Sequence, residues 1–272
     1  MFMGLLTGKK ILLTGLLNSK SIAWGIAQEC INEGAELCIT YQNETVKKRV
    51  LPLAEELGCS FIAPCDVSSD ESINELFAEI KNKWGHLDGM LHCLAFSDKN
   101  ELKGGITGTS RANFTMALDI SAYSLIAMSA KAKELMQANG SIVTLTYFGA
   151  EKWVPNYNVM GVAKAALEAS VRYLAQDLGG SGIRINAISS GPVKTLAASG
   201  ISDFNYMLRY HELNTALKEN TSIEDNGKTA VYLFSDLSRN VTGEVIHVDG
   251  GYHIMGMKDP NTESIELPKT TE

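Results

Sequence analysis

Tyr157 and Lys164, in the stretch NYNVMGVAK (156–164), are residues whose types and spacing could do chemistry. Seven residues make almost two helical turns, so both long side chains fall on one helix face, about 10.5 Å apart along the axis. A phenol has an ordinary pKa of about 10, and a nearby lysine cation is expected to lower it, which suits a tyrosine that donates a proton or hydrogen bond. Without further context, a half-buried tyrosine and an unrelated surface lysine remain the commoner explanation.

Composition narrows the class of protein. The chain has 272 residues, 45% of them hydrophobic and 20% charged, which is ordinary for a globular protein with a full core. The net charge of −7 disfavours a nucleic-acid partner. The first ten residues leave no room for a signal peptide before a strand begins, and no apolar run approaches the roughly 20 residues that span a membrane. We therefore expect a soluble, cytoplasmic protein with no membrane partner.

The cysteines indicate a reducing compartment. There are five of them, scattered along the chain, and none forms a C-x-x-C pair. A zinc site, or any other metal site, is therefore not expected, and the odd number suits reduced thiols in a cytosol.

Short apolar runs alternate with longer amphipathic stretches along the chain. The pattern predicts seven strands, at 9–15, 36–41, 59–67, 87–96, 140–148, 183–189 and 243–251. It predicts helices at 21–35, 44–58, 69–85, 110–138, 157–179 and 222–236. Regular alternation of this kind favours an α/β fold, in which helices cover both faces of a doubly wound parallel sheet. We expect one domain over residues 1–257, followed by a polar, poorly ordered tail at 258–272.

The first predicted strand ends in a turn that could bind a dinucleotide phosphate. Gly15 permits a tight turn, and a helix beginning near Ser21 would offer free N–H groups to an anion. The fingerprint G-x-G-x-x-G is absent, because Gly25 lies well inside the predicted helix. A tight turn without any ligand explains this stretch about as well.

Two further strand ends bear on the choice of cofactor. Gln42 follows the second strand, where an acidic residue often binds the adenosine ribose, and the first cation after it is Lys47. A 2′-phosphate would need a closer cation, so the balance favours NAD. Asp66 ends the third strand and could accept a hydrogen bond from adenine. Equally well, it could supply negative charge at the N-terminus of the following helix.

Context strengthens the Tyr157–Lys164 pair. Tyr147 ends the strand before it, and a Gly-Pro break at 191–192 follows the next strand. The chain carries the motifs KKILLTG, SIAWGIA, TYQNE, CDV, YFGAEKWVPNYNVMGVAKAALEA, VRYLAQDLG, INAISSGPVKTLAASGI and TGEVIHVDGG. Together they resemble the short-chain dehydrogenase/reductase superfamily, to about residue 257. Most members place tyrosine four residues before lysine, where this chain has Met160. The longer spacing, with Tyr147 upstream, resembles the branch of bacterial enoyl-acyl carrier protein reductases of type II fatty-acid synthesis.

The resemblance implies a Rossmann-like reductase with a helical loop that covers the substrate. NADH would deliver hydride to the β-carbon of a trans-2-enoyl thioester on acyl carrier protein. Tyr157 would stabilise the oxyanion that develops on the thioester carbonyl, Lys164 would hold the nicotinamide ribose, and Tyr147 would line the pocket as a further catalytic residue. A homotetramer is also implied.

Position by position, the resemblance assigns two sets of residues. The cofactor would contact Lys164 together with Gly15, Ser21, Ile22, Gln42, Asp66, Val67, Cys93, Leu94, Ala95, Val193 and Thr195. The substrate would contact Ala95, Tyr147, Tyr157, Met160, Ala197, Ile201, Phe204 and Met207. From the residues alone, the apolar members of the second set could instead be ordinary helix packing.

The chain departs from the family pattern at two places. Cys93 stands where serine is frequent, and Ala95 where some members have glycine. The covering stretch SGISDFNYMLRY carries Arg209, with Lys194 before it, where members often have more cations facing the acidic carrier protein. Two other functions stay open: a carbonyl or alcohol reductase of the same superfamily, and a dinucleotide-binding protein that does no chemistry.

Overall fold

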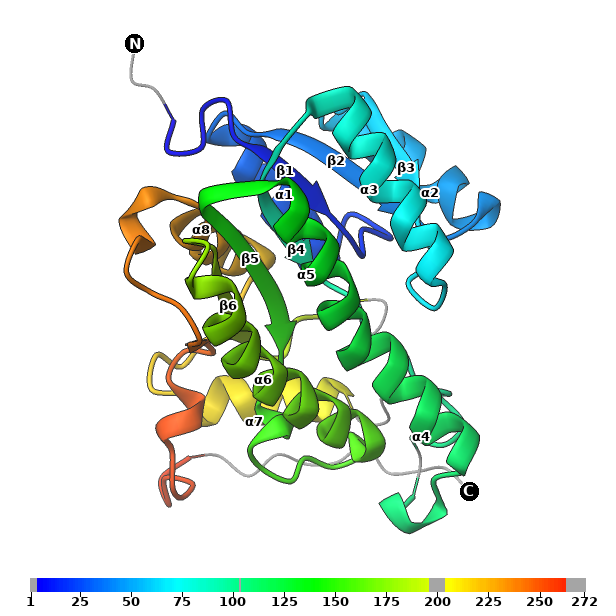
Figure 1. The fold of residues 1–272 in the computed structure, drawn as a ribbon. Helices are drawn as coiled ribbons and strands as arrows, with labels where there is room; N and C mark the ends of the chain where they lie inside the picture. Colours follow the sequence, from blue (N-terminus) through cyan, green and yellow to red (C-terminus); the bar gives the residue numbers. More distant parts are fainter. Residues whose placement is uncertain (1–3, 103, 196–203, 263–272) are drawn as a thin grey trace.

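The computed structural model describes residues 4–102, 104–195 and 204–262. Within these ranges, seven strands form one sheet in the order β3-β2-β1-β4-β5-β6-β7, and every neighbouring pair is parallel (Figure 1). The strands are β1 (Lys10–Leu13), β2 (Glu36–Tyr41), β3 (Phe61–Pro64), β4 (Leu87–His92), β5 (Met136–Thr146), β6 (Arg184–Ser190) and β7 (Val245–Val248). This order confirms the predicted doubly wound α/β class, with the winding reversed between β1 and β4.

Helices cover both faces of the sheet. One face carries α1 (Ile22–Asn32), α2 (Glu44–Glu56) and α8 (Ile223–Phe234), and the other carries α3 (Asp70–Trp84), α5 (Ser124–Leu135) and α6 (Asn158–Gly179). In Figure 1 the second group lies on the viewer's side of the sheet. Two further α-helices, α4 (Arg111–Leu118) and α7 (Phe204–Asn214), complete the set among the described residues.

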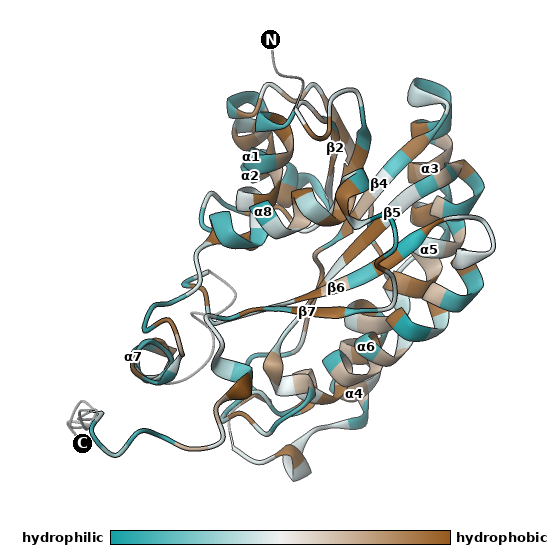
Figure 2. Cartoon of the chain, turned by 90° about the vertical axis from the view of Figure 1, so that its left-hand side faces the viewer, coloured by the Kyte–Doolittle hydropathy of each residue, from teal (hydrophilic) through white to brown (hydrophobic). Residues whose placement is uncertain are grey.

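Strand β1 shows why the apolar runs are continuous. Ile11 and Leu13 belong to the core cluster on the α1–α8 side, and Leu12 belongs to the cluster on the α3–α5–α6 side. A strand buried on both faces needs an apolar residue at every position, and Figure 2 shows the strands as mainly hydrophobic between the helix layers.

Helix α3 begins and ends next to the capping residues that its sequence contains. The Ser69 hydroxyl accepts from the Ser72 N–H group, acidic residues occupy the first turn, and Gly85 ends the helix with φ of 75°. None of the described helices is long and apolar enough to cross a membrane.

Several predicted boundaries differ from those in the structure, and the most informative difference lies at Met136. The helix predicted at 110–138 is α4, a π-helical turn at Asp119–Tyr123, and α5, which ends at Leu135. Strand β5 then begins at Met136 because this residue pairs with Leu87, with a register shift before Gly89. The polar stretch after Met136 has no strand periodicity, so only the partner strand defines it. In the predicted covering loop, α7 begins at Phe204.

Candidate active site

The predicted cofactor residues follow the carboxyl ends of the strands. Gly15 follows β1, Gln42 follows β2, Asp66 follows β3, Cys93 follows β4 and Val193 follows β6. All seven strands run in parallel, so these ends share one edge of the sheet. Open sheets of this kind bind ligands at this edge, at the point where the winding reverses.

The ends of β1 and β4 are held in close contact. Gly15 has φ of 82°, and a Cβ atom there would collide with the carbonyl oxygen of Cys93. The Thr14 hydroxyl donates to the Leu91 carbonyl at 2.9 Å and accepts from the Cys93 N–H group at 3.1 Å. Gly15 therefore meets both conditions that require glycine, a left-handed backbone and a close approach.

The residues after Cys93 stay near this contact. Leu94 is partly buried against the α3–α5–α6 core, and Ala95 is exposed at the sheet edge. Burial raises the pKa of the Cys93 thiol to about 11, so the thiol is neutral near pH 7.

The N-terminus of α1 faces the same edge. Ser21 caps the helix: its hydroxyl accepts from the Trp24 N–H group at 3.2 Å and donates to the Asn18 carbonyl at 2.8 Å. The first N–H groups of a helix, beginning here with Ile22, have no partner inside the helix and attract phosphate. A Cβ at Gly25 would collide with the Ile223 carbonyl, so this second glycine serves the packing of α1 on α8.

Gln42 and Asp66 lie together. The Gln42 amide donates to Asp66 Oδ2 at 3.2 Å, and Asp66 Oδ1 accepts from the N–H group and the hydroxyl of Ser68. Burial acts to raise the pKa of Asp66, but the hydrogen bonds from Ser68 and Gln42 prevail and lower it. The carboxylate therefore stays ionised as an acceptor, and Val67 beside it packs partly buried on the core.

Lys164 is buried, with 6% of its surface exposed, and its ammonium donates to the Leu145 carbonyl at 2.7 Å. Burial lowers the pKa of Lys164 to about 8, while Cys93 and Glu168 act in the opposite direction. A lysine on a helix surface would be neither buried nor lowered in pKa. The alternative that Lys164 is an unrelated surface lysine is therefore wrong.

Tyr147 and Tyr157 form an aromatic pair beside α6. Their ring centroids lie 4.9 Å apart with an interplanar angle of 72°. Gly149 permits this arrangement, because a Cβ there would collide with the Tyr157 ring, and Gly161 lets α6 approach the Gly149 carbonyl. The two glycines are site residues that the sequence analysis missed.

The pKa of Tyr157 is raised, whereas the nearby lysine was expected to lower it. Burial raises the pKa of Tyr157 above its ordinary value, and the neighbouring Tyr147 and Glu168 raise it further. Burial likewise raises the pKa of Tyr147. The Lys164 ammonium is bound to the Leu145 carbonyl, so its charge does not prevail over the loss of solvation. Both phenols are therefore protonated near neutral pH and can act as hydrogen-bond donors.

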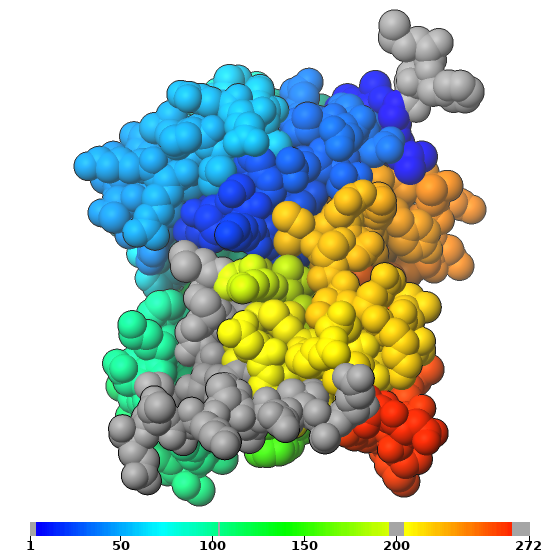
Figure 3. Space-filling view, turned by 180° about the vertical axis from the view of Figure 1, so that it is seen from behind, coloured from blue at the N-terminus to red at the C-terminus, as the bar shows by residue number. Residues whose placement is uncertain are grey.

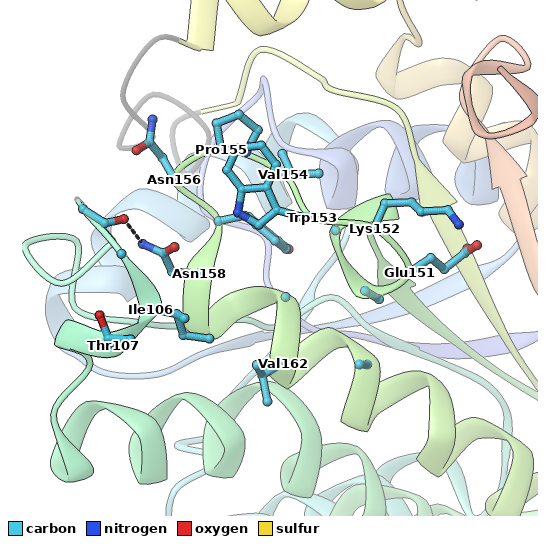
Figure 4. A pocket seen from close by; sticks show the side chains of 17 residues that line it. Ile106, Thr107, Glu151, Lys152, Trp153, Val154, Pro155, Asn156, Asn158 and Val162 are labelled. Atoms are coloured by element: carbon cyan, nitrogen blue, oxygen red, sulfur yellow. Dashed lines mark hydrogen bonds between the residues drawn. The ribbon is translucent and has the colours of Figure 1, made fainter. Parts of the chain in front are cut away.

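A cavity of about 640 Å³ adjoins Tyr157 on the outer side of α6. It lies between residues 104–107, the loop 149–158 and the first turns of α6 (Figure 4). Asn158 joins two of these segments, because its amide donates to the carbonyls of Leu102 and Gly104. Trp153 stands on the rim with 84% of its surface exposed.

The predicted substrate residues fall into three groups. Met160 is buried in a small cluster with Val159 and Ala117, against which Tyr157 packs. Phe204 and Met207 lie on α7, which Figure 3 shows in yellow at the surface below the blue N-terminal elements. Phe204 is buried and Met207 partly so, whereas Ala197 and Ile201 lie outside the described residues.

Beyond β6, Val193 and Thr195 follow the Gly-Pro break. Both are partly buried, and the Thr195 N–H group donates to the Val193 carbonyl at 2.7 Å. The segment therefore turns back on itself directly after the sheet edge.

Glu168 is a further residue that the sequence analysis missed. It is 7% exposed, and its Oε1 accepts from the Thr146 hydroxyl at 2.6 Å. The signal was available, because Glu168 stands four residues after Lys164 and shares its helix face.

His92 closes β4 directly before Cys93 and is fully buried. Its Nδ1 lies 3.0 Å from the Thr144 hydroxyl and its Nε2 lies 2.8 Å from the Ser124 hydroxyl. Ser124 also donates to the Ile120 carbonyl at 2.7 Å, so it accepts from His92 Nε2–H. His92 thus joins the central strands to the π-helical turn.

We expect His92 to make the protein less stable in acid. Burial lowers the pKa of His92 to about 3, while the unfolded chain protonates near its ordinary value of 6.5. Below that value the unfolded state binds the proton first, so the free energy of unfolding falls by about 1.4 kcal/mol per pH unit. Between pH 7 and pH 5, denaturant unfolding should show a loss of roughly 2 kcal/mol from this residue.

The matched variant for this measurement is His92→Asn, which carries no titrating ring. Its stability should change less than that of the wild type between the two pH values. An equal loss in both proteins would assign the acid sensitivity to other groups.

The order of the strands, the switch point between β1 and β4, and the helix N-terminus beside it define a doubly wound, dinucleotide-binding α/β protein. Residues 15–253 match the family model described as enoyl-(acyl carrier protein) reductase. The chain belongs to this family.

Three relatives illustrate the similarity. The NADH enoyl-acyl-carrier-protein reductase of Rickettsia felis is 59% identical over 253 residues, which cover 93% of this chain and 97% of that protein. The Anaplasma phagocytophilum reductase, solved with NAD, is 52% identical with a TM-score of 0.92, over 96% of this chain and 98% of the other. The Bacillus cereus reductase, solved with NADP+ and an indole naphthyridinone, is 52% identical with the same TM-score, over 94% and 100% of the two chains.

Proposed function

We propose that the protein reduces the trans-2 double bond of enoyl thioesters carried on acyl carrier protein, with NADH as reductant, in fatty-acid synthesis. The observation that carries this proposal is the buried Lys164 on α6, about two helical turns after Tyr157, which directly precedes this helix and is in contact with Tyr147. Family membership and the NADH-dependent relatives give the same activity.

The chain's own groups have distinct tasks in this reaction. NADH, when bound, supplies the hydride. Tyr157 donates a hydrogen bond to the thioester oxygen, where negative charge develops in the transition state. Its raised pKa supports a neutral donor, which holds its proton throughout the ordinary pH range. Lys164 holds the ribose hydroxyls of the cofactor, and Tyr147 shapes the pocket beside the reacting carbonyl.

We propose these cofactor-binding residues because their hydrogen-bonding groups match those of the cofactor. The α1 N-terminus, with Gly15, Ser21 and Ile22, would receive the pyrophosphate. Gln42, Asp66 and Val67 would surround the adenosine, because the ionised Asp66 carboxylate can accept from the adenine amino group. Backbone groups of Cys93, Leu94, Ala95, Val193 and Thr195 would line the nicotinamide half.

The substrate side is proposed from the apolar residues around the tyrosine pair. Met160 packs beside Tyr157, and Phe204 on α7 is buried near the same edge. With Ala95 and Met207 they would enclose the acyl chain. Ala197 and Ile201 would complete the enclosure.

The test of the activity compares two electron acceptors. NADH absorbance should fall when the enzyme is mixed with crotonyl-coenzyme A, and should hold steady with a simple ketone. Oxidation with the ketone alone would favour a carbonyl reductase, and oxidation with neither would favour a dinucleotide-binding protein without catalysis.

We expect NADH to be the preferred cofactor. Gln42 and Asn43 offer no cation to a 2′-phosphate, and Glu44 would repel it. The nearby Lys47 is paired with Glu44 at 3.3 Å. The ratio kcat/KM should therefore be higher for NADH by about tenfold or more, the value of one charge-assisted hydrogen bond.

Steady-state kinetics with both cofactors checks this preference, which the fold alone leaves open because a relative was solved with NADP+. The matched variant Gln42→Arg should narrow the difference. A higher ratio for NADPH in the wild type would contradict this interpretation of the β2 turn.

The assembly is proposed to be a homotetramer of one-domain chains. Helices on one face of the sheet expose large apolar side chains: Phe114, Tyr123, Ile126, Val162 and Tyr173. A surface of this kind is typical of subunit contacts. Residues 1–257 are proposed as one domain, since β1 and β7 belong to one sheet, and 258–272 as its tail. Five free cysteines support a cytoplasmic location.

A further inference from the structure

Two charged side chains of α6 form hydrogen bonds with consecutive residues of β5. Lys164 and Glu168 stand four residues apart on α6, so they lie side by side on its buried face. The Lys164 ammonium donates to the Leu145 carbonyl at 2.7 Å, and the Glu168 carboxylate accepts from the Thr146 hydroxyl at 2.6 Å. Strand β5 therefore holds the ammonium of Lys164 and the carboxylate of Glu168 at neighbouring positions along the sheet.

We propose that Glu168 is a positioning residue that keeps the ammonium of Lys164 charged and thereby sets the pH range in which the protein binds NADH. The inference rests on the proposed role of Lys164 in holding the cofactor ribose. Glu168 acts through Lys164, and the proposal gives it no contact with substrate or cofactor.

The groups that face Lys164 leave Glu168 as the source of negative charge. His92, the last residue of β4, and Cys93 directly after it interact with Lys164. Both are neutral near pH 7, because burial raises the pKa of the thiol to about 11 and lowers that of the imidazole to about 3. Tyr157 is a protonated phenol. Glu168 raises the pKa of Lys164 against the larger effect of burial, which lowers it to about 8.

The groups that face Glu168 act in both directions. Burial raises its pKa, and Glu151 raises it further. The Thr146 hydroxyl lowers the pKa, as do His247 of β7 and Arg172 of α6 when they are charged. Glu151 is itself in contact with His247, whose Nε2 lies 2.8 Å from Glu151 Oε1. The pKa of Glu168 is raised overall, while the hydrogen bond from the Thr146 hydroxyl favours the ionised carboxylate on which the proposal depends.

The experiment measures NADH affinity by fluorescence titration from pH 6 to pH 10. In the wild type, affinity should decline above about pH 8 as Lys164 loses its proton. Glu168→Gln should match the wild type at pH 6, and its decline should move toward acid by about 1 pH unit, the lower end of the effect of a neighbouring opposite charge. Thr146→Val, which leaves the carboxylate unanchored, should move the decline in the same direction by less.

Two control variants separate the possible failures. Glu151→Gln removes an exposed carboxylate and should leave the decline in place. Lys164→Met should bind NADH weakly at every pH and show no decline. If Lys164→Met binds as tightly as the wild type, the proposed role of Lys164 is wrong and this inference is wrong with it.

The inference alone fails if Lys164→Met weakens binding as expected but Glu168→Gln declines at the wild-type pH. It also fails if Glu168→Gln loses affinity equally at all pH values, since that result would indicate a structural role. Should Glu168→Gln not fold, Thr146→Val decides, and an unmoved decline in that variant overturns the proposal.

Discussion

Tyr157→Phe is expected to lower the turnover number for enoyl thioester reduction by about 10²–10³-fold, because one lost donor to a developing oxyanion costs about 3–4 kcal/mol of barrier. Phenylalanine keeps the ring that packs on Tyr147 and Gly149, so the fold should be retained. The measurement is steady-state kinetics with crotonyl-coenzyme A, together with a thermal unfolding curve. Turnover near that of the wild type would remove Tyr157 from the mechanism.

The matched control is Tyr147→Phe, since the two rings are in contact and both phenols are protonated. We expect this change to act mainly on KM, because Tyr147 is proposed to shape the pocket. The opposite pattern, in which Tyr147→Phe loses turnover and Tyr157→Phe does not, would exchange the roles of the two hydroxyls.

Gly15→Ala is the second change with a large expected effect. Its φ of 82° opposes any side chain, and the new methyl group would collide with the Cys93 carbonyl. The left-handed backbone costs about 1–2 kcal/mol and the overpacking about 1–3 kcal/mol, so the free energy of unfolding should fall by roughly 2–5 kcal/mol. Relief of the collision would separate the ends of β1 and β4, so NADH binding should be lost as well.

Gly85→Ala isolates the backbone contribution. Gly85 has φ of 75°, but nothing lies within 4 Å of the position that its Cβ would take. It precedes β4 and so lies at the amino edge of the sheet, away from the site. This variant should lose about 1–2 kcal/mol of stability and keep its NADH affinity. Equal losses of affinity in both variants would show that Gly15 has no special part in the site.

The fold was predictable where local signals and burial agree. Ile11, Leu12 and Leu13 alternate between two cores, so β1 is an apolar run that a sequence pattern can detect. Met136 is different, because its strand conformation depends on pairing with Leu87, which lies 49 residues earlier in the chain. The π-helical turn at Asp119–Tyr123 also has no periodicity of its own, so the sequence predicted one continuous helix.

The sequence predicted the positions of the candidate site but not the electrostatics around them. The spacing of Tyr157 and Lys164 indicated one helix face, and Lys164 is indeed buried on it. The direction of the Tyr157 pKa depends on burial and on where the ammonium points, and neither follows from spacing. Gly149 and Gly161 were missed because their role is a close approach between the loop after β5 and the start of α6, not a local turn.

The position of β1 between β2 and β4 has a consequence for synthesis of the chain. Gly15, Gln42 and Asp66 follow β1, β2 and β3, so this part is complete by residue 66, whereas Tyr157 and Lys164 depend on β5 and α6. A nascent chain can therefore assemble first the half that is proposed to bind adenosine, but one edge of β1 stays unpaired until β4 emerges. Parallel pairing across such an interval is slow, and an open central edge can pair with another chain. During the interval between β3 and β4, the open edge is therefore that of β1, the strand at which the winding of the finished sheet reverses.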